Sequence, residues 1–379
     1  MGLMLKGVLI VAKKQELKYY SLDNILKKNS VYNVIFGERS NGKTYAVLKY
    51  GIEQYFKTGG QIAIIRRWKE DITGKRASDM FSALNYNGEV KKASNGEYEG
   101  ITYYAGKFYV CTYAENGKPI YSDSDCIGYV FALSDTEHNK SISYPRITTI
   151  LFDEFLTKFT YLQDEFILFM NTISTIIRQR TNVKIFMLGN TVNKYCPYFA
   201  EMGLNHIEKM KQDTIDLYTY GTSELTVAVE YCGSMKGSKE NNFYFAFNNP
   251  KLNMITSGAW ELNLYPHLPM KYKPKEVLFR YFIIFNNRIY QANIIDVDGE
   301  MFTYIHNKTT DIQDDDNDLI YTLEYNYKLN YNRNIYKPIN SLQKKILWFF
   351  INDKVFYQSN EVGDSINNYL KICKNYKGV

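Results

Sequence analysis

The residues of this chain that are best suited to chemistry form a loop bounded by two glycines. The loop fits the pattern G-x-x-x-x-G-K-[ST] and consists of Gly37, Glu38, Arg39, Ser40, Asn41, Gly42, Lys43 and Thr44. In such a loop, backbone N–H groups and the start of the following helix hold phosphate oxygens. Lys43 would neutralise the β- and γ-phosphates, and the Thr44 hydroxyl would bind Mg²⁺. The pattern predicts an ATP site, although a glycine turn that merely opens a helix is the alternative.

A pair of adjacent carboxylates, Asp153 and Glu154, follows the apolar run 147–152. Two acids at the tip of a buried strand are costly unless a cation or a hydrogen-bond donor meets them. In P-loop NTPases an Asp at this place supports Mg²⁺, and a following Glu polarises the attacking water. The alternative is a strand that leaves the core through a solvated acidic turn. Together with the upstream loop, the pair predicts metal support by Asp153 and catalysis by Glu154.

Two further polar positions stand at the ends of predicted elements. Asn190 ends the strand-like run 184–188 and either contacts the γ-phosphate or its water or only terminates the strand. Arg178 stands near the end of a helical stretch over 162–180. It either enters a neighbouring subunit's site as an arginine finger or only complements the helix macrodipole.

Charged residues elsewhere admit two interpretations each. Arg66-Arg67 and Lys75-Arg76 follow the predicted strand 61–65, where they contact phosphates of nucleotide or DNA or are only solvated. Residues 328–379 hold nine Lys and Arg against three acids, interleaved with Tyr and Asn, as a nucleic-acid face would be. The acidic run 311–318 is better explained as a solvated loop than as a metal site.

The elements that must position these residues alternate between strands and helices. Strands are predicted at 31–36, 61–65, 129–133, 147–152 and 183–188, helices at 43–55 and 162–180, and hairpins over 101–121. Runs that are apolar on both faces indicate a mostly parallel sheet in an α/β domain, here with a hairpin insertion. We expect an ATPase domain over 1–205, a linker over 206–242 and a smaller α+β domain over 243–379. The last contains strands at 243–247, 277–285 and 288–295 and helices at 342–351 and 365–374.

Composition sets the limits for these predictions. The 379 residues are 45% apolar and 23% charged, which excludes wholesale disorder, and the net charge of +6 is only mildly basic. Five cysteines without a CxxC pair favour a reducing compartment and no zinc site or disulfide framework. The longest apolar runs fall far short of the roughly 20 residues that a bilayer requires, so no membrane span is expected.

The motifs, in their order, resemble the DNA-packaging (encapsidation) ATPases of φ29-like phages. GERSNGKT is followed by a hairpin insertion, ILFDEF, a helix ending in IIRQR, KIFMLGN and NKYCPYF, so the resemblance covers about residues 30 to 200. It implies the additional-strand, catalytic-Glu class of P-loop NTPase, with ATP and Mg²⁺ bound by Lys43, Thr44 and Asp153. Glu154 would be the catalytic base and Arg178 the finger acting in trans. It also implies an RNase H-like C-terminal domain without nuclease activity.

The predicted function is an ATP-driven translocase that packages double-stranded viral DNA into a preformed procapsid. The resemblance implies a homo-oligomeric ring, a pentamer, docked transiently on the phage portal in the host cytoplasm, often through a structural RNA. Three alternatives stay open: a terminase-like motor with a working nuclease, a DNA-binding scaffold that binds nucleotide without turnover, and a helicase. Asp296 and Asp298, at the end of a predicted strand, leave a residual nuclease metal site open.

Overall fold

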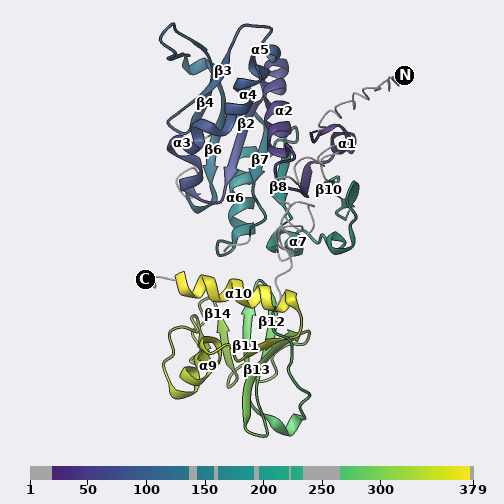
Figure 1. Ribbon diagram of the computed structural model, residues 1–379, viewed down its shortest axis with the longest axis vertical. Coiled ribbons are helices and arrows are strands. Elements are labelled where there is room, and N and C mark those ends of the chain that lie inside the picture. Colours follow the sequence, from purple (N-terminus) through teal and green to yellow (C-terminus); the bar gives the residue numbers. More distant parts are fainter. Residues whose placement is uncertain are drawn as a thin grey trace, which may run out of the picture.

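Two β-sheets organise the chain in the computed structural model, one above the other in Figure 1. The structure describes residues 19–135, 143–157, 161–191, 196–221, 223–233 and 265–375. The predicted strand at 243–247 lies outside these residues. Among the described helices, none is long and apolar enough to cross a bilayer.

The larger sheet is mixed, and six parallel strands form its centre. The strand order is β3-β4-β6-β2-β7-β8-β1-β10-β9, with β5 paired to β4. Neighbours from β6 to β10 run parallel, whereas β4, β3 and the opposite edge strand β9 are antiparallel additions. This arrangement confirms the prediction of an α/β fold with a large, mostly parallel sheet. The bounds are β1 (Tyr32–Gly37), β2 (Gln61–Arg66), β3 (Gly100–Tyr104), β4 (Lys107–Tyr113), β5 (Pro119–Ile120), β6 (Cys126–Ala132), β7 (Ile147–Asp153), β8 (Lys184–Asn190), β9 (Thr214–Thr219) and β10 (Thr226–Cys232).

The central strands carry apolar side chains on both faces of the sheet, as is typical of parallel strands that are covered by helices on both faces. Ile35 and Ile62 pack in the cluster that contains the apolar side of α2, whereas Phe36 and Ala63 pack in the cluster with α6. The helices of this part are α1 (Asp23–Leu26), α2 (Lys43–Thr58), α3 (Gly74–Ser78), α4 (Ser82–Tyr86), α5 (Glu89–Ala93), α6 (Glu165–Ile177) and α7 (Pro197–Glu201).

Helix α6 is shorter at both ends than the predicted stretch 162–180. It begins at Glu165 because Asp164 has a left-handed backbone, with φ of 51°. It ends at Ile177 because Arg178 and Gln179 have φ of 45° and 68°. Such conformations are uncommon for residues other than glycine, so the apolar pattern alone did not reveal these ends.

The predicted linker over 206–242 is wrong in its first part, because β9 and β10 lie within it. β1 pairs in parallel along its whole length with residues 227–232 of β10, so β10 completes the centre of the large sheet. Its residues Val227 to Cys232 are buried. The rest of the division into domains stays a prediction.

The smaller sheet has the order β15-β14-β11-β12-β13-β16. β11, β12 and β13 form an antiparallel meander, to which β14, β15 and β16 add in parallel. Helices α9 and α10 pack on it around a separate core that contains Ile305, Phe349 and Ile366. The bounds are β11 (Val277–Phe285), β12 (Arg288–Val297), β13 (Glu300–Lys308), β14 (Leu319–Thr322), β15 (Tyr331–Asn332), β16 (Val355–Tyr357), α9 (Ser341–Ile351) and α10 (Asn360–Asn375).

Candidate nucleotide-binding site

The carboxyl ends of four parallel strands bring the predicted site residues to one edge of the large sheet. β8 lies between β1, which precedes the glycine loop, and β7, which carries the acidic pair. Gly37 is in register with Asn190, and Asp153 with Leu188. β2 pairs with the other side of β7, so Arg66 ends at the same edge. Ligands of open α/β sheets bind outside such strand ends.

The glycine loop depends on two glycines and on contacts of Lys43. A Cβ on Gly37 would lie 2.4 Å from the Cys232 carbonyl oxygen, so the loop can pass β10 only without a side chain there. Gly42 has φ of 95° and precedes α2, a conformation that favours glycine. Lys43 Nζ donates to the Glu38 carbonyl at 2.6 Å and to Asn190 Oδ1 at 3.4 Å. The amine therefore ties the loop to the tip of β8.

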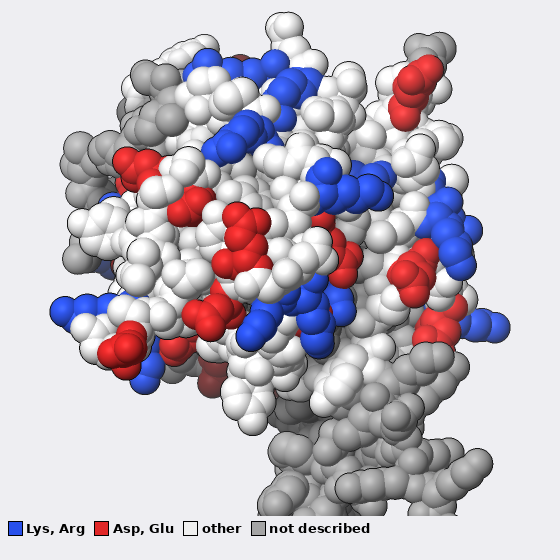
Figure 2. Space-filling model, turned by 90° about the horizontal axis from the view of Figure 1, so that it is seen from above, with Lys and Arg blue, Asp and Glu red and all other residues white. Residues whose placement is uncertain are grey.

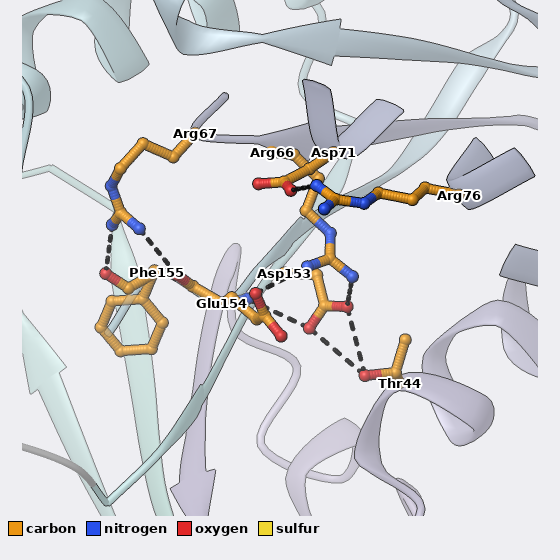
Figure 3. A network of polar contacts seen from close by, with 8 residues as sticks. All are labelled: Thr44, Arg66, Arg67, Asp71, Arg76, Asp153, Glu154 and Phe155. Atoms are coloured by element: carbon orange, nitrogen blue, oxygen red, sulfur yellow. Dashed lines mark hydrogen bonds and ion pairs between the residues drawn. The ribbon is translucent and has the colours of Figure 1, made fainter. Parts of the chain in front are cut away.

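The acidic pair meets both a hydroxyl and a guanidinium (Figure 3). Thr44 Oγ1 lies 3.2 and 3.3 Å from the two carboxylate oxygens of Asp153. Arg66 pairs with Asp153 through Nη2 at 2.8 Å and with Glu154 through Nη1 at 2.9 Å. The side chain of Glu154 is 62% exposed, against 9% for Asp153. One arginine thus pairs with a buried carboxylate and an accessible one, and its single positive charge leaves one negative charge uncompensated when both are ionised.

Burial shifts the pKa values of Asp153 and Lys43 in the directions that favour their uncharged forms. Burial raises the pKa of Asp153 against the opposing effect of Arg66, and burial lowers the pKa of Lys43. A divalent cation at Asp153 would therefore relieve an unfavourable environment for its carboxylate. The Asp153 oxygens and the Thr44 hydroxyl are the hard oxygen donors that Mg²⁺ prefers, so these residues fit that ion.

A cavity of about 360 Å³ joins these groups. Seven of its residues come from the glycine loop, the start of α2 and the end of β2, and five from the ends of β7 and β8. They are Ser40, Asn41, Gly42, Lys43, Thr44, Tyr45, Arg66, Asp153, Glu154, Leu188, Gly189 and Asn190. Gly37, Glu38 and Arg39 belong to the same loop but do not line the cavity. The structure thus brings together the loop, the acidic pair and Asn190.

Arg178 lies apart from this group. It is exposed, does not line the cavity, and follows the last residue of α6. Its helix is 13 residues long, so Arg178 stands about 20 Å along the axis from Glu165, which is beside the site. Arg180 instead donates to the carbonyls of Ile147 and Ile176. Arg180 thus supports the end of α6, whereas the Arg178 side chain is exposed.

A buried ion pair behind the acidic turn was missed from the sequence. Arg67 Nε and Nη2 contact the Glu165 carboxylate at 2.7 and 2.9 Å, with side chains 6% and 0% exposed. Arg67 also donates to the Glu154 and Phe155 carbonyls, at 3.2 and 2.8 Å (Figure 3). The Tyr198 hydroxyl completes the cluster with a 2.9 Å bond to Glu165. Neither Arg66 nor Arg67 is a solvated charge, because Arg66 lines the cavity and Arg67 is buried behind the acidic turn. Their place at a strand end was the only signal in the sequence.

This cluster reaches the C-terminal part of the chain. The Arg67 guanidinium lies 5.0 Å from the ring centroid of Tyr161. The Tyr161 backbone N–H donates to Asn368 Oδ1 on α10 at 3.4 Å. A direct contact therefore connects the segment after the acidic pair with the smaller sheet's helix.

Two of the nine basic residues in 328–379 form ion pairs with acids in the structure. Lys328 forms ion pairs with Asp315 and Asp316 of the acidic run, and Lys354 pairs with Glu300. Within the described residues, no group of three or more His, Cys, Asp or Glu is arranged to hold a metal ion.

Comparisons with known proteins identify the family to which the chain is similar. The family model described as Podovirus DNA encapsidation protein (Gp16) matches residues 14–239, more than half of the chain. The DNA packaging protein of Bacillus phage phi29 is 28% identical over 189 residues, which are 49% of this chain and 50% of that protein. That of Bacillus phage B103 is 28% identical over 183 residues, or 48% and 50%. The matched region spans about half the length of these curated relatives.

Solved structures share the fold over nearly the whole chain. The Phi-28 gp11 DNA packaging motor has a TM-score of 0.59 at 17% identity, and covers 95% of this chain and 99% of that one. The bacteriophage Phi-29 viral genome packaging motor assembly has a TM-score of 0.57 at 20% identity, with 93% and 99% covered. Both sheets thus belong to a known arrangement.

The buried ion pair generates a stability prediction. Arg67→Met leaves the Glu165 carboxylate buried without its cation and should lower the free energy of unfolding by about 3–5 kcal/mol. Urea unfolding of the full chain measures this change. The matched control is Arg76→Met, which breaks the 2.7 Å pair with Asp71, whose side chains are 67% and 31% exposed. That variant should lose less than about 1 kcal/mol, and equal losses would contradict a special role for Arg67.

Proposed function

Because the chain belongs to the podovirus DNA encapsidation protein family, we propose that it hydrolyses ATP to drive double-stranded DNA into a preformed procapsid. The observation that carries this proposal is the convergence of Lys43 and Thr44 with Asp153 and Glu154 on one cavity. A phosphate-binding loop and an acidic pair at nearby strand ends are the nucleotide-binding and catalytic motifs of a P-loop ATPase. β8 between the two motif strands supports the additional-strand class.

Five residues of the cavity have defined tasks in this proposal. Lys43 neutralises charge on the β- and γ-phosphates, while Thr44 and Asp153 hold Mg²⁺. Mg²⁺ held there would supply positive charge that offsets the negative charge of the triphosphate. Glu154 orients and polarises the attacking water. Asn190, already 3.4 Å from the Lys43 amine, is placed to contact the γ-phosphate or its water.

Arg66 has a task that follows from its two ion pairs. In the structure it holds Glu154 at 2.9 Å and Asp153 at 2.8 Å. For Glu154 to reach a water beside the γ-phosphate, this carboxylate must leave Arg66. The guanidinium then remains close to the phosphates, where it favours the charge that develops in the transition state.

Subunits of a ring complete the site in this proposal. Arg178 is exposed and stands about 20 Å along α6 from Glu165, so it serves as a finger for a neighbour's site. The family resemblance supports a homo-oligomeric ring, a pentamer, that docks on the portal through a structural RNA. The host cytoplasm is the compartment in which this docking takes place.

The smaller sheet supports an RNase H-like domain without nuclease activity. Its antiparallel meander β11-β12-β13, extended in parallel by β14 and β15, fits that fold. The centre of β11 carries Tyr281 and Phe282 in place of an acid. Asp296 at the end of β12 accepts a bond from the Gly299 N–H at 2.9 Å, as a turn residue would.

DNA contact should be directed at phosphates, since a packaging motor must accept every sequence. Figure 2 shows one end of the molecule, where basic and acidic side chains are interspersed over the large-sheet part. A face of mixed sign gives little long-range attraction to a duplex. We therefore place the DNA-binding surface elsewhere on the assembled ring.

The roles of the two acids can be separated by Glu154→Gln. The amide keeps the size of the side chain but cannot act as a base, so turnover should fall about 10²–10⁴-fold. ATP affinity should stay near the wild-type value, because Asp153 and the loop hold the triphosphate. Equilibrium binding and phosphate release measure the two quantities. A collapse of ATP affinity instead would mean that Glu154 supports the metal.

The finger is tested by mixing two inactive variants. Arg178→Ala subunits keep an intact loop, and Lys43→Ala subunits keep an intact finger, so mixed rings contain some complete interfaces. Each variant alone should lose about 10³-fold or more in turnover, and mixing should restore part of it. Phosphate release is measured over a range of ratios. Lack of rescue at every ratio contradicts action in trans.

Coupling to DNA is the test of the function as a whole. ATP hydrolysis in the presence of procapsids should increase on addition of double-stranded DNA, and rising salt should weaken this stimulation steeply. A chain that binds ATP but does not respond to DNA would be a scaffold rather than a motor. Plasmid nicking with Mn²⁺ in the same preparation would instead favour a terminase-like motor with a working nuclease.

A further inference from the structure

A second cavity, of about 660 Å³, adjoins the phosphate cavity at the start of α2. Both cavities are lined by Gly42 and Tyr45, so they meet at the first turn of the helix. The walls of the second cavity come from α2, from the segment 19–26 that precedes β1, and from the region of α4. None of the tasks assigned above uses this space.

The position of the second cavity relative to the acidic pair indicates which part of a nucleotide would bind there. Asp153, Glu154 and Asn190 line only the first cavity, which is therefore the end for the γ-phosphate. The loop and the helix start hold the α- and β-phosphates. A nucleotide bound in this direction has its sugar and base beyond the α-phosphate, on the side of Tyr45.

The segment before β1 is fastened to the loop and presents an aromatic ring there. The Tyr20 N–H donates to the Asn41 carbonyl at 2.9 Å, and the Tyr20 hydroxyl donates to Glu230 on β10 at 2.6 Å. The neighbouring Tyr19 ring lies 3.4 Å from the place of a Cβ on Gly42. Tyr19 is nevertheless 62% exposed, so most of its ring is available for stacking.

Hydrogen bonds of Tyr45 on α2 fix the orientation of the Asn87 amide, which also lines the cavity. The Tyr45 hydroxyl donates its single proton to Glu89 Oε1 at 3.1 Å, because an ionised carboxylate only accepts. The 3.2 Å contact between Tyr45 and Asn87 must then use the Asn87 Nδ2 as donor. Asn87 Oδ1 is left as the acceptor on that side chain. An acceptor suits the exocyclic amino group of adenine and opposes the O6 acceptor of guanine.

We propose that the second cavity is the adenine subsite, with Tyr19 stacking on the base and Asn87 Oδ1 accepting from its amino group. This inference rests on the proposed ATPase function and adds the basis of its choice among nucleotides. Tyr45 links the two subsites, since it begins beside the phosphate loop and its hydroxyl positions Asn87.

The experiment compares ATP, GTP and inorganic tripolyphosphate, each with Mg²⁺, in equilibrium binding to the full chain. The wild type should bind ATP more tightly than GTP and much more tightly than tripolyphosphate. Tyr19→Ala should weaken ATP about 5- to 150-fold, the range for loss of one stacked base, without changing the affinity for tripolyphosphate. Tyr19→Phe keeps the ring and should bind ATP as the wild type does. Asn87→Ala should remove the preference of ATP over GTP.

The matched control is Tyr86→Ala, whose ring is 92% exposed next to Asn87 but does not line the cavity. It should change none of the three affinities. An unchanged ATP affinity in Tyr19→Ala, or an equal loss for tripolyphosphate, overturns the adenine subsite while the phosphate site stands. Failure of the wild type to bind even tripolyphosphate overturns the ATPase proposal and this inference with it.

Discussion

Two negative charges, Asp153 and Glu154, stand side by side at the end of a buried strand, and the rest of the site is arranged around that constraint. Like charges at this distance in a poorly solvated place repel strongly, and burial adds its own cost for Asp153. Arg66 and Thr44 supply the opposing charge and the hydroxyl from two other elements. The strand order β2-β7-β8-β1 is what makes these partners available, because it places the necessary strand ends next to one another.

A second ion pair fixes the chain immediately after the acidic residues. Arg67 holds the carbonyls of Glu154 and Phe155 while it pairs with Glu165 at the start of α6. The turn that carries the proposed catalytic carboxylate and the helix that precedes Arg178 are therefore held by the same buried ion pair. The Tyr161 contact with Asn368 extends this support to α10. A displacement of the acidic turn would therefore change contacts of both α6 and α10.

Local patterns were sufficient for much of the fold and of the site. The loop, the acidic pair and Asn190 each lie at the end of a short apolar run, so their strands and their common edge followed from sequence. The strand 277–285 and the helix 342–351 agree with β11 and α9 to within one residue. The alternation of strands and helices likewise identified the parallel sheet, since strands covered on both faces read as continuous apolar runs.

The features that could not be predicted from the sequence are those that depend on which strands are neighbours in the sheet. Arg66 could be assigned to the acidic pair only after β2 was known to lie beside β7. β10 was taken for linker because its partner, β1, is almost two hundred residues earlier in the chain. Glu165 reads as an ordinary helix-start acid, and its burial against Arg67 is a tertiary property. The cavity at Tyr19 and Asn87 is of the same kind, formed by segments distant in sequence.

The backbone conformation at the end of α6 affects how Arg178 could contact a neighbouring subunit in the proposed ring. Arg178 and Gln179 both adopt left-handed conformations, each at a cost of roughly 1–2 kcal/mol for an L-residue. Arg180 offsets this cost by donating to four carbonyl oxygens at 2.5 to 3.1 Å. The turn that contains Arg178 and Gln179 is thus held in place by the hydrogen bonds of Arg180. Under the proposed role of Arg178 in a neighbouring site, this backbone would already be ordered, so only the side chain would lose conformational freedom on contact.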